Sequence, residues 1–479
     1  MTPLADMARA ILAAAIEAVQ PETLLRKLTY TPSGVVWGDE SFEPPGRLIV
    51  VALGKAAPGL GATFLAHAAR RPDSVFVLCP DSVSVPASVA GVTRTAAHPV
   101  PDRRGREATA ELRAVLAGLE AEDGVVVLIS GGASALLAEP LPGFDGESVI
   151  ELTRALLGRG ATIGELNTVR KHMLAATGGR LASGCPAQML TLTLSDVPGD
   201  DPATIASGPT IGDPTTLADA ASVLRRRGLG DRFAAVLAAF DAARPELESP
   251  KPGDPRLQRS RVHALGSNRD ALAAASAAAA RAGFSARILT TRLTGEARRI
   301  GAAVGALACS VASGEPVALL AAGETTVTVT GDGSGGRNLE LALAAARVLD
   351  GVPERCVLAA GTDGIDGSSP AAGAVVDGGT IGRGAARGRD ASAALLHNDA
   401  WGYFAGSPEA VVTGATGTNV SDVVIALAAG ARPLLLGEVA AVAELTSESA
   451  RLAGPRSGPD GPTDPVVTAP GGRRRAPLH

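Results

Sequence analysis

Runs of apolar, β-branched residues that end in glycine-rich turns recur along this chain, and alanine- or leucine-rich segments follow these turns. The first run is Arg47–Leu53, its turn is Gly54–Ala57, and the segment that follows is Gly59–Ala69. A continuous apolar run is typical of a strand buried on both faces, and the order of strand, turn and helix is typical of a doubly wound sheet. The sequence therefore predicts the α/β fold class, which binds ligands at the carboxyl ends of its strands.

The same alternation continues on both sides of a proline-rich segment, Glu246–Arg256, which we interpret as an interdomain linker. In the first half we expect strands at Ser74–Cys79, Gly124–Ile129 and Met189–Leu194, and helices at Glu107–Glu120 and Leu166–Ala182. In the second half we expect strands at His263–Leu265, Ala286–Thr291, Val317–Ala321, Thr325–Thr330, Val357–Ala360 and Val411–Thr413, and helices at Ala271–Ala282, Glu296–Ala312 and Leu339–Leu349.

A chain of 479 residues is longer than one hydrophobic core usually serves, so the sequence predicts two domains. The predicted boundaries are residues 1–250 for the first domain and 260–445 for the second. The segment 455–479 is rich in proline and glycine, which predicts a disordered tail.

Composition excludes several classes of protein. The formal charge of −5 and the lack of a basic cluster with interleaved aromatic residues argue against a nucleic-acid partner. We find neither a signal-peptide pattern nor an apolar stretch long enough to span a bilayer, so we expect a cytoplasmic protein without a membrane partner. The cysteines lack metal-site and disulfide spacing.

The glycine-rich segment Gly331–Gly336 predicts a strand-to-helix turn that ends at Arg337. Backbone N–H groups in such a turn, together with the start of the helix, favour an anion such as a phosphate. A flexible hairpin with a surface arginine is the alternative.

Lys55 also stands out, because lysine is rare in this chain: of 44 basic residues, only Lys27, Lys55, Lys171 and Lys251 are lysines. Its position after the first predicted strand places a compact ammonium group where open α/β sheets bind ligands. A solvent-exposed lysine at a helix start is the alternative.

Two further turns carry polar groups suited to phosphate or metal chemistry. In Ser130–Leu136, Ser130, Gly131, Gly132 and Ser134 could hold a phosphate through backbone N–H and hydroxyl groups. In Ser195–Pro202, Asp196 is one of three crowded carboxylates that could bind Mg²⁺ or act as a general base. We interpret His98 as a loop histidine.

Acyl-transfer catalysis has little support, because the chain contains no Gly-x-Ser-x-Gly elbow and no Ser/His/Asp order. The dinucleotide fingerprint Gly-x-Gly-x-x-Gly is absent after the first predicted strand. Phosphoryl transfer requires the groups that are present, namely cations, a carboxylate and anion-binding turns.

Several motifs, taken together and in this order, resemble the glycerate 2-kinase family with the MOFRL C-terminal domain. They are Leu53–Ala57, Ser130–Leu136, Leu194–Asp200, Ala206–Thr210, Gly323–Thr326, Gly335–Asn338 and Gly361–Gly367. The resemblance implies ATP-dependent phosphorylation of D-glycerate to 2-phosphoglycerate, in a cleft between a Rossmann-like N-terminal domain and a smaller α/β C-terminal domain. The matching site positions are Lys55, Asp196, Asn268, Glu324, Arg337 and Asp363.

From these positions we predict that Lys55 and Arg337 act on the phosphoryl group and that Asp196 is a base or an Mg²⁺ ligand. Asn268 is predicted to bind nucleotide or substrate, and Glu324 and Asp363 are candidate metal ligands. We expect ATP and Mg²⁺ as cofactors, D-glycerate as the small-molecule partner, and a monomer or homodimer. A hydroxypyruvate reductase, or a non-catalytic protein that binds sugar acids or nucleotides, is the alternative.

Overall fold

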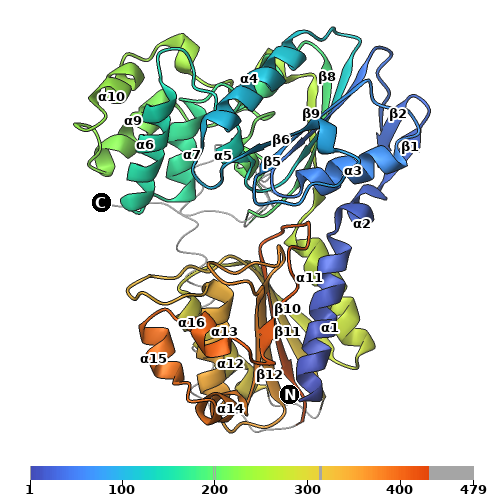
Figure 1. Cartoon of the computed structure of the whole chain (residues 1–479). Helices are drawn as coiled ribbons and strands as arrows, with labels where there is room; N and C mark the ends of the chain where they lie inside the picture. The colour runs from blue at the N-terminus through green and yellow to red at the C-terminus, as the bar shows by residue number, and fades with distance from the viewer. Residues whose placement is uncertain (1, 198, 200, 312–314, 431–479) are drawn as a thin grey trace, which may run out of the picture.

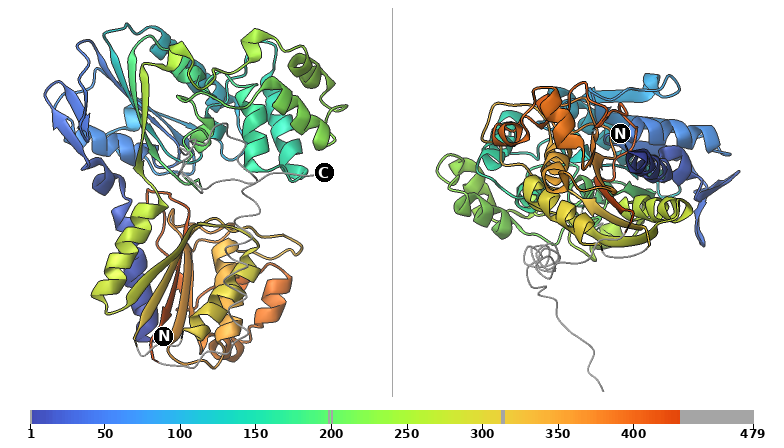
Figure 2. Two further views of the ribbon diagram at one scale, coloured as in Figure 1. Left: turned by 180° about the vertical axis from the view of Figure 1, so that it is seen from behind. Right: turned by 90° about the horizontal axis from the view of Figure 1, so that it is seen from below.

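The computed structural model describes residues 2–197, 199, 201–311 and 315–430. These residues form two α/β domains, one above the other in Figure 1, each built on a six-stranded sheet. In each sheet, several strands end at the boundary between the two domains (Figures 1 and 2).

The first sheet is fully parallel, in the order β6-β5-β4-β7-β8-β9. Its strands are β4 (Leu48–Leu53), β5 (Ser74–Pro80), β6 (Thr93–Ala96), β7 (Gly124–Ile129), β8 (Gln188–Leu194) and β9 (Ser260–Gly266). Every residue of β4 and β7 is buried, as their uninterrupted apolar sequences predict. The strand order reverses between β4 and β7, and such a switch point is where doubly wound sheets bind ligands.

Helices cover both faces of this sheet. On one face, α3 (Ala57–His67) packs against side chains such as Val50 and Val126. On the other face, α4 (Arg103–Ala117), α5 (Ala133–Leu136) and α8 (Arg180–Ser183) share a core with Val51 and Val127. The small antiparallel sheet of β1 (Leu28–Thr31), β2 (Gly34–Trp37) and β3 (Glu40–Phe42) lies at the edge of the domain.

A helical lobe with its own core extends from the first domain. It consists of α6 (Gly146–Gly158), α7 (Ile163–Lys171), α9 (Leu217–Arg226) and α10 (Ala234–Asp241), and lies at the upper left of Figure 1. The segment predicted as the interdomain linker, Glu246–Arg256, packs on this lobe instead: Leu247 is buried in its core, and Glu248 accepts a hydrogen bond from His172. That prediction is therefore wrong.

The second sheet is mixed, in the order β10-β11-β15-β12-β13-β14. Its strands are β10 (Ser285–Leu293), β11 (Val317–Gly323), β12 (Arg355–Gly361), β13 (Gly373–Asp377), β14 (Ala410–Val411) and β15 (Asp422–Ala428). Strand β15 runs antiparallel to both of its neighbours, β11 and β12. One face packs on α12 (Ala297–Ser310) and α13 (Arg337–Leu349), and α14 (Thr380–Ala386), α15 (Ala391–Leu396) and α16 (Ala400–Phe404) lie beyond them.

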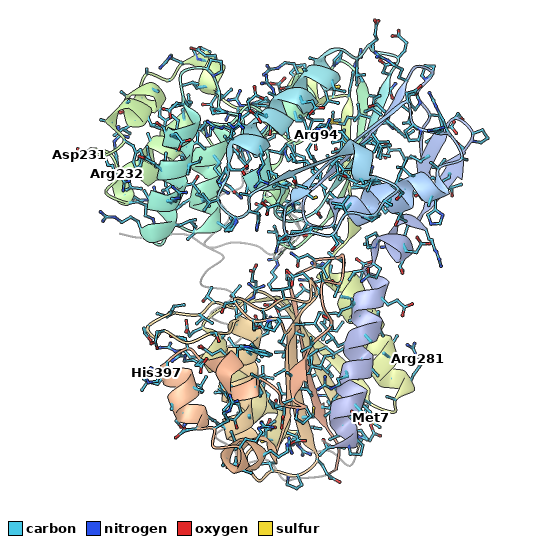
Figure 3. All side chains as sticks on the ribbon, viewed as in Figure 1. Met7, Arg94, Asp231, Arg232, Arg281 and His397 are labelled. Atoms are coloured by element: carbon cyan, nitrogen blue, oxygen red, sulfur yellow. The ribbon has the colours of Figure 1, made fainter. Side chains whose placement is uncertain are left out.

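The other face of the second sheet is covered by α1 (Pro3–Ala18) and α11 (Asn268–Arg281), which lie side by side in both Figure 1 and Figure 2. Figure 3 shows Met7 on the outer side of α1 and Arg281 at the far end of α11. The chain therefore passes between the domains before α2 (Pro21–Leu25) and again between β9 and α11. The boundaries predicted from the sequence assign α1 to the first domain and β9 to the second. In the structure α1 packs on the second sheet, and β9 pairs with β8 of the first.

Two predicted elements are wrong for identifiable reasons. Thr325–Thr330 is not a strand: most of the segment after Thr325 is exposed, and an isolated bridge between Thr326 and Glu296 is the only strand-type pairing that the described residues show for it. Leu166–Ala182 is not one helix: α7 ends at Lys171, and Gly178 and Gly179 adopt positive φ angles of 58° and 82° before α8. The predicted tail, 455–479, lies outside the described residues.

In the described part of the chain, no helix combines the length and the apolar character needed to cross a membrane.

The contact between α1 and α11 predicts that small residues are required there. Ala275 of α11 is fully buried in the core that includes Ala8 and Ala15 of α1. Ala275→Leu is expected to lower the free energy of unfolding by about 1–3 kcal/mol, because added methylene groups would force these helices apart. Urea unfolding measures this, and Ala273→Leu on the exposed side of the same helix is the matched control. Equal effects of the two substitutions would contradict the packing.

Candidate active site

A cleft of ≈ 1130 Å³ lies between the domains and shares Asp196, Glu324 and Arg337 with a smaller cavity of ≈ 230 Å³. The smaller cavity is lined almost entirely by polar groups from the ends of strands and from the loops beside them. They are Lys55, Asp196, Glu324, Arg337, Asp363, Ile365, Gly367, Asn419 and Ser421. The structure thus brings together five of the six site positions predicted from the sequence.

Lys55 is placed by the turn that follows β4. Gly54 adopts φ = 107°, and a Cβ atom there would overlap the Ser130 carbonyl oxygen, so only glycine fits this turn. The Lys55 N–H donates to the Gly131 carbonyl at 2.9 Å. Its Nζ lies 3.3 Å from Asp363 Oδ2 in the second domain, and the two side chains are 34% and 25% exposed. The ammonium group therefore faces the boundary between the domains.

Ser130 supports this turn from inside the protein. Its hydroxyl is fully buried, accepts from the Ala56 N–H at 2.9 Å and donates to the Leu53 carbonyl at 3.2 Å. The prediction that the Ser130 side chain holds a phosphate is therefore not supported, because both of its bonds stay within the protein. Gly131, Gly132 and Ser134 do line the cleft, as expected for the predicted turn.

Asp196 follows β8 and faces the same cavity. Asn419 Nδ2 donates to its Oδ2 at 3.3 Å, and Ser421 Oγ donates to its backbone carbonyl at 2.7 Å, so both contacts cross the domain boundary. Burial and the negative charge of Glu324, opposed by Lys55, together raise the pKa of Asp196 to about 6. A carboxyl with this pKa can accept a proton near neutral pH.

Arg337 is held by two carboxylates. Its Nε and Nη2 donate to the two oxygens of buried Asp422 at 2.6 and 2.9 Å, and its Nη1 lies 2.6 Å from Glu324 Oε1. Burial alone would lower the pKa of Arg337, but these carboxylates raise it, so the guanidinium stays charged. Burial also raises the pKa of Glu324, which Arg337 opposes.

The position of β15 explains how Asp422 reaches this site. Asp422 pairs with Gly323 at the end of β11 on one side and with Gly361 at the end of β12 on the other. An antiparallel strand between two parallel ones therefore brings its first residue to the edge where they end. Asn419, Ser421 and Asp422 were not predicted as site residues, because sequence alone did not reveal this insertion.

The predicted anion site in Gly331–Gly336 is wrong. The backbone N–H groups of Asn338 and Leu339, at the start of α13, donate to the Asp366 carboxylate at 3.1 and 2.8 Å. The Gly331 N–H donates to Asn398 Oδ1 at 2.9 Å. A carboxylate of the protein therefore occupies the place where a phosphate was expected, and the loop serves to position Arg337.

Asn268 lies outside the site. Its side chain is buried at the start of α11, donates to the Thr291 carbonyl at 3.1 Å, and lines neither cavity. The structure therefore gives Asn268 a role in joining α11 to β10 and no contact with the cleft.

His98, Asn167 and Arg170 line the larger cleft and were not predicted as site residues. Burial, together with the positive charges of Lys55 and Arg170, lowers the pKa of His98 to about 4, so the imidazole is neutral near pH 7. The interpretation of His98 as a simple loop residue is therefore incomplete. For Arg170, the only feature of the sequence that could have indicated a site residue is its charge within the predicted helix Leu166–Ala182.

Glu324 and Asp363 face the small cavity, but each is already paired with a basic side chain, Arg337 or Lys55. Within the described ranges, no group of three His, Cys, Asp or Glu side chains is arranged to hold a metal ion. The two carboxylates therefore fit Mg²⁺ only if other oxygens, such as those of a phosphate, complete its shell, and this is the usual arrangement for Mg²⁺.

Comparison with known proteins identifies the family. Residues 7–241 match the domain of unknown function DUF4147, and residues 317–422 match the MOFRL family. A glycerate 2-kinase of Pyrococcus horikoshii is 34% identical over 87% of this chain and 96% of its own length. This chain belongs to the glycerate 2-kinase family. Both the predicted family and the two-domain α/β class are confirmed.

Other members of the glycerate 2-kinase family support this assignment. The D-glycerate 2-kinase of Thermotoga maritima is 40% identical over 69% of this chain and 79% of its own length. A crystal structure of a glycerate kinase from the same organism superposes with a TM-score of 0.77 at 35% identity, covering 89% of this chain and 99% of that one. A protein of Agrobacterium vitis, named putative hydroxypyruvate reductase, is 41% identical over 79% of this chain and 87% of its own length.

The two serines of the turn after β7 are expected to differ in role. Ser130→Ala should lower the free energy of unfolding by about 1–3 kcal/mol, because it leaves the buried Ala56 N–H without a partner. Ser134→Ala on the cleft side should change it much less. Denaturant unfolding of both variants tests this, and a smaller loss for Ser130→Ala than for Ser134→Ala would contradict the assigned roles.

Proposed function

We propose that this protein is a glycerate 2-kinase that transfers the γ-phosphoryl group of ATP to the 2-hydroxyl of D-glycerate, giving 2-phosphoglycerate and ADP. The observation that carries the proposal is that Lys55 and Arg337, from different domains, line one small cavity together with Asp196. The names of the relatives from Thermotoga maritima and Pyrococcus horikoshii support the substrate and the position of transfer.

In this proposal the two cations stabilise the phosphoryl group during transfer. Phosphoryl transfer depends mainly on positioning and on positive charge near the equatorial oxygens. Lys55 supplies a compact ammonium group from the first domain, and Arg337 supplies a guanidinium fixed by Asp422 from the second. The site is therefore complete only when the domains lie close together.

Asp196 is the proposed general base. It takes the proton of the 2-hydroxyl while that oxygen forms a bond to the γ-phosphorus. The bond between this phosphorus and the bridging oxygen of ADP breaks, and ADP leaves with the electron pair. The raised pKa of Asp196 suits this role, since the carboxylate is mostly ionised at pH 7 and still basic enough to accept a proton.

Glu324 and Asp363 are the proposed ligands for Mg²⁺, together with phosphate oxygens. When bound, the ion neutralises negative charge on the phosphates. The carboxylates themselves are near enough to raise the pKa of Asp196, so a cation here also reduces repulsion within the cavity. A cytoplasmic location and a monomeric or homodimeric state remain predictions.

A hydroxypyruvate reductase is the second candidate, because a relative from Agrobacterium vitis carries that name. Such an enzyme consumes NADH, whereas the turn after β4 carries Lys55 in place of a dinucleotide fingerprint. Loss of NADH absorbance with hydroxypyruvate in the absence of ATP would favour the reductase. Binding of D-glycerate or ATP with no turnover of either would favour a non-catalytic protein.

The kinase proposal predicts a specific reaction product and a loss of activity in a specific variant. ³¹P NMR of a reaction with D-glycerate, ATP and Mg²⁺ should show 2-phosphoglycerate and ADP.

Lys55→Ala should lower kcat by at least about 10²-fold, because it removes positive charge from the phosphoryl site. Lys27→Ala is the matched control, since Lys27 pairs with Asp270 outside both cavities. Near-normal turnover of a folded Lys55→Ala variant would remove Lys55 from this role.

The raised pKa of Asp196 predicts a pH dependence. Because the base must be ionised, kcat/KM should fall about tenfold per pH unit below about 6 and level off above it. Asp196→Asn should lower kcat at least about 10²-fold, and its residual activity should lack this inflection; titration of ATP itself would persist in the variant.

The raised pKa of Asp196 also determines how this group changes the stability of the folded state with pH. The folded state binds the Asp196 proton more tightly than the unfolded state, whose aspartate pKa is about 3.9. This group therefore adds stability as pH falls from about 6 towards 4, and Asp196→Asn should not lower Tm at pH 7.5. An unchanged pH profile in the variant would contradict the assignment.

A further inference from the structure

Arg170 of α7 is a buried charge that has no ion-pair partner among the described residues. Its side chain lines the interdomain cleft, the residue is only 6% exposed, and its Nε atom has no hydrogen-bond acceptor. No described residue forms an ion pair with it, and burial alone lowers its pKa to about 10. The guanidinium is thus still protonated near neutral pH.

A buried guanidinium without a counter-charge destabilises the folded state, because no ion pair offsets its loss of hydration. Asp196 and Glu324 line the same cleft, but neither forms an ion pair with Arg170, and burial alone shifts the pKa of this arginine. Since the described residues supply no counter-charge, an anion from outside the protein would fill this role.

The polar groups around Arg170 suit such an anion. Asn167, one turn before Arg170 on α7, is buried, and its Oδ1 accepts from Ser207 Oγ at 2.9 Å. Ser207 Oγ also lies 2.9 Å from Ser134 Oγ, on the turn that follows β7. These contacts connect α7 to the switch point of the first sheet, so the polar wall that begins at Arg170 leads towards Lys55.

The groups on the other side of Arg170 are apolar. Ile163 and Leu166 precede it by seven and four residues on the same face of α7, so the face changes from apolar to charged over about 10 Å. Leu157 and Ile163 of the first domain are 47% and 61% exposed, and Val329 of the second is 72% exposed. All three line this cleft, which therefore has an apolar mouth formed by both domains.

We propose that Arg170 binds the phosphate chain of the nucleotide and that Leu157, Ile163 and Val329 enclose its base. An apolar mouth, a buried cation and then a second cation at Lys55 match the order of base, phosphate chain and transferred phosphoryl group. The inference rests on the proposed kinase function and adds the binding site of the donor. The carboxylate of D-glycerate is the other anion of the reaction, but the small cavity, lined by Lys55 and Arg337, suits the acceptor.

Titration calorimetry with ADP and Mg²⁺, and separately with D-glycerate, tests the proposal. Arg170→Met should weaken ADP binding at least about tenfold and leave D-glycerate binding and its KM unchanged. Ile163→Ser should weaken ADP binding by a smaller factor. Weaker D-glycerate binding with normal ADP binding would overturn the proposal in favour of the carboxylate, and no change in either would show that Arg170 binds no substrate.

Thermal unfolding separates a binding role from a structural one. Arg170→Met should leave the Tm of the ligand-free protein unchanged or higher, because an uncompensated charge is removed, and should reduce the rise in Tm caused by ADP. Arg180→Met is the matched control: Arg180 is also largely buried with an unpaired Nε, but its Nη2 donates to the Leu247 carbonyl at 2.7 Å and it lies off the cleft. That variant should lose Tm and keep its affinity for ADP.

The two proposals fail in different ways. If the natural protein makes 2-phosphoglycerate while Arg170→Met binds ADP normally, only the assignment of Arg170 is wrong. If the natural protein binds no ADP and makes no product, the kinase proposal fails and this inference with it.

Discussion

The pair formed by Arg337 and Asp422 is the interaction on which the site depends. Asp422 is only 3% exposed, and both of its oxygens accept from the Arg337 guanidinium. A buried carboxylate in this position is stable only because it is paired, and the pairing fixes the direction of the arginine. The remaining N–H groups of Arg337 then face Glu324 and the cavity, where positive charge is needed.

The two domains contribute different chemistry to the cleft. The first supplies Lys55, Arg170 and a neutral His98, whereas the second supplies Glu324, Asp363 and the paired Arg337. Contacts such as Lys55 with Asp363, and Ser421 with the Asp196 carbonyl, join complementary groups across the boundary. Neither domain alone therefore contains a complete set of groups for phosphoryl transfer.

Sequence patterns were sufficient for four of the six strands of the first sheet and for most of the small cavity. Continuous apolar runs identify β4, β5, β7 and β8, and the glycine turn after β4 correctly places Lys55. The sequence was misleading where a backbone group is satisfied by a distant residue. The Asp366 carboxylate accepts from the backbone N–H groups at the start of α13, where the sequence analysis expected a phosphate. The Ser130 hydroxyl accepts from the Ala56 N–H of the neighbouring turn. The antiparallel β15, and the lack of an ion-pair partner for Arg170 among the described residues, depend on tertiary packing, so local composition does not reveal them.

The position of α1 also bears on how the protein assembles during synthesis. This helix precedes its neighbour α11, which begins at Asn268, by about 250 residues, and β15, the last strand of the sheet beneath both helices, follows later still. At a translation rate of about 5–20 residues per second, the elements that cover α1 are synthesised on the order of ten seconds or longer after α1 itself. Its apolar stripe, which includes Leu4, Ile11 and Leu12, therefore lacks its native packing surface throughout that interval.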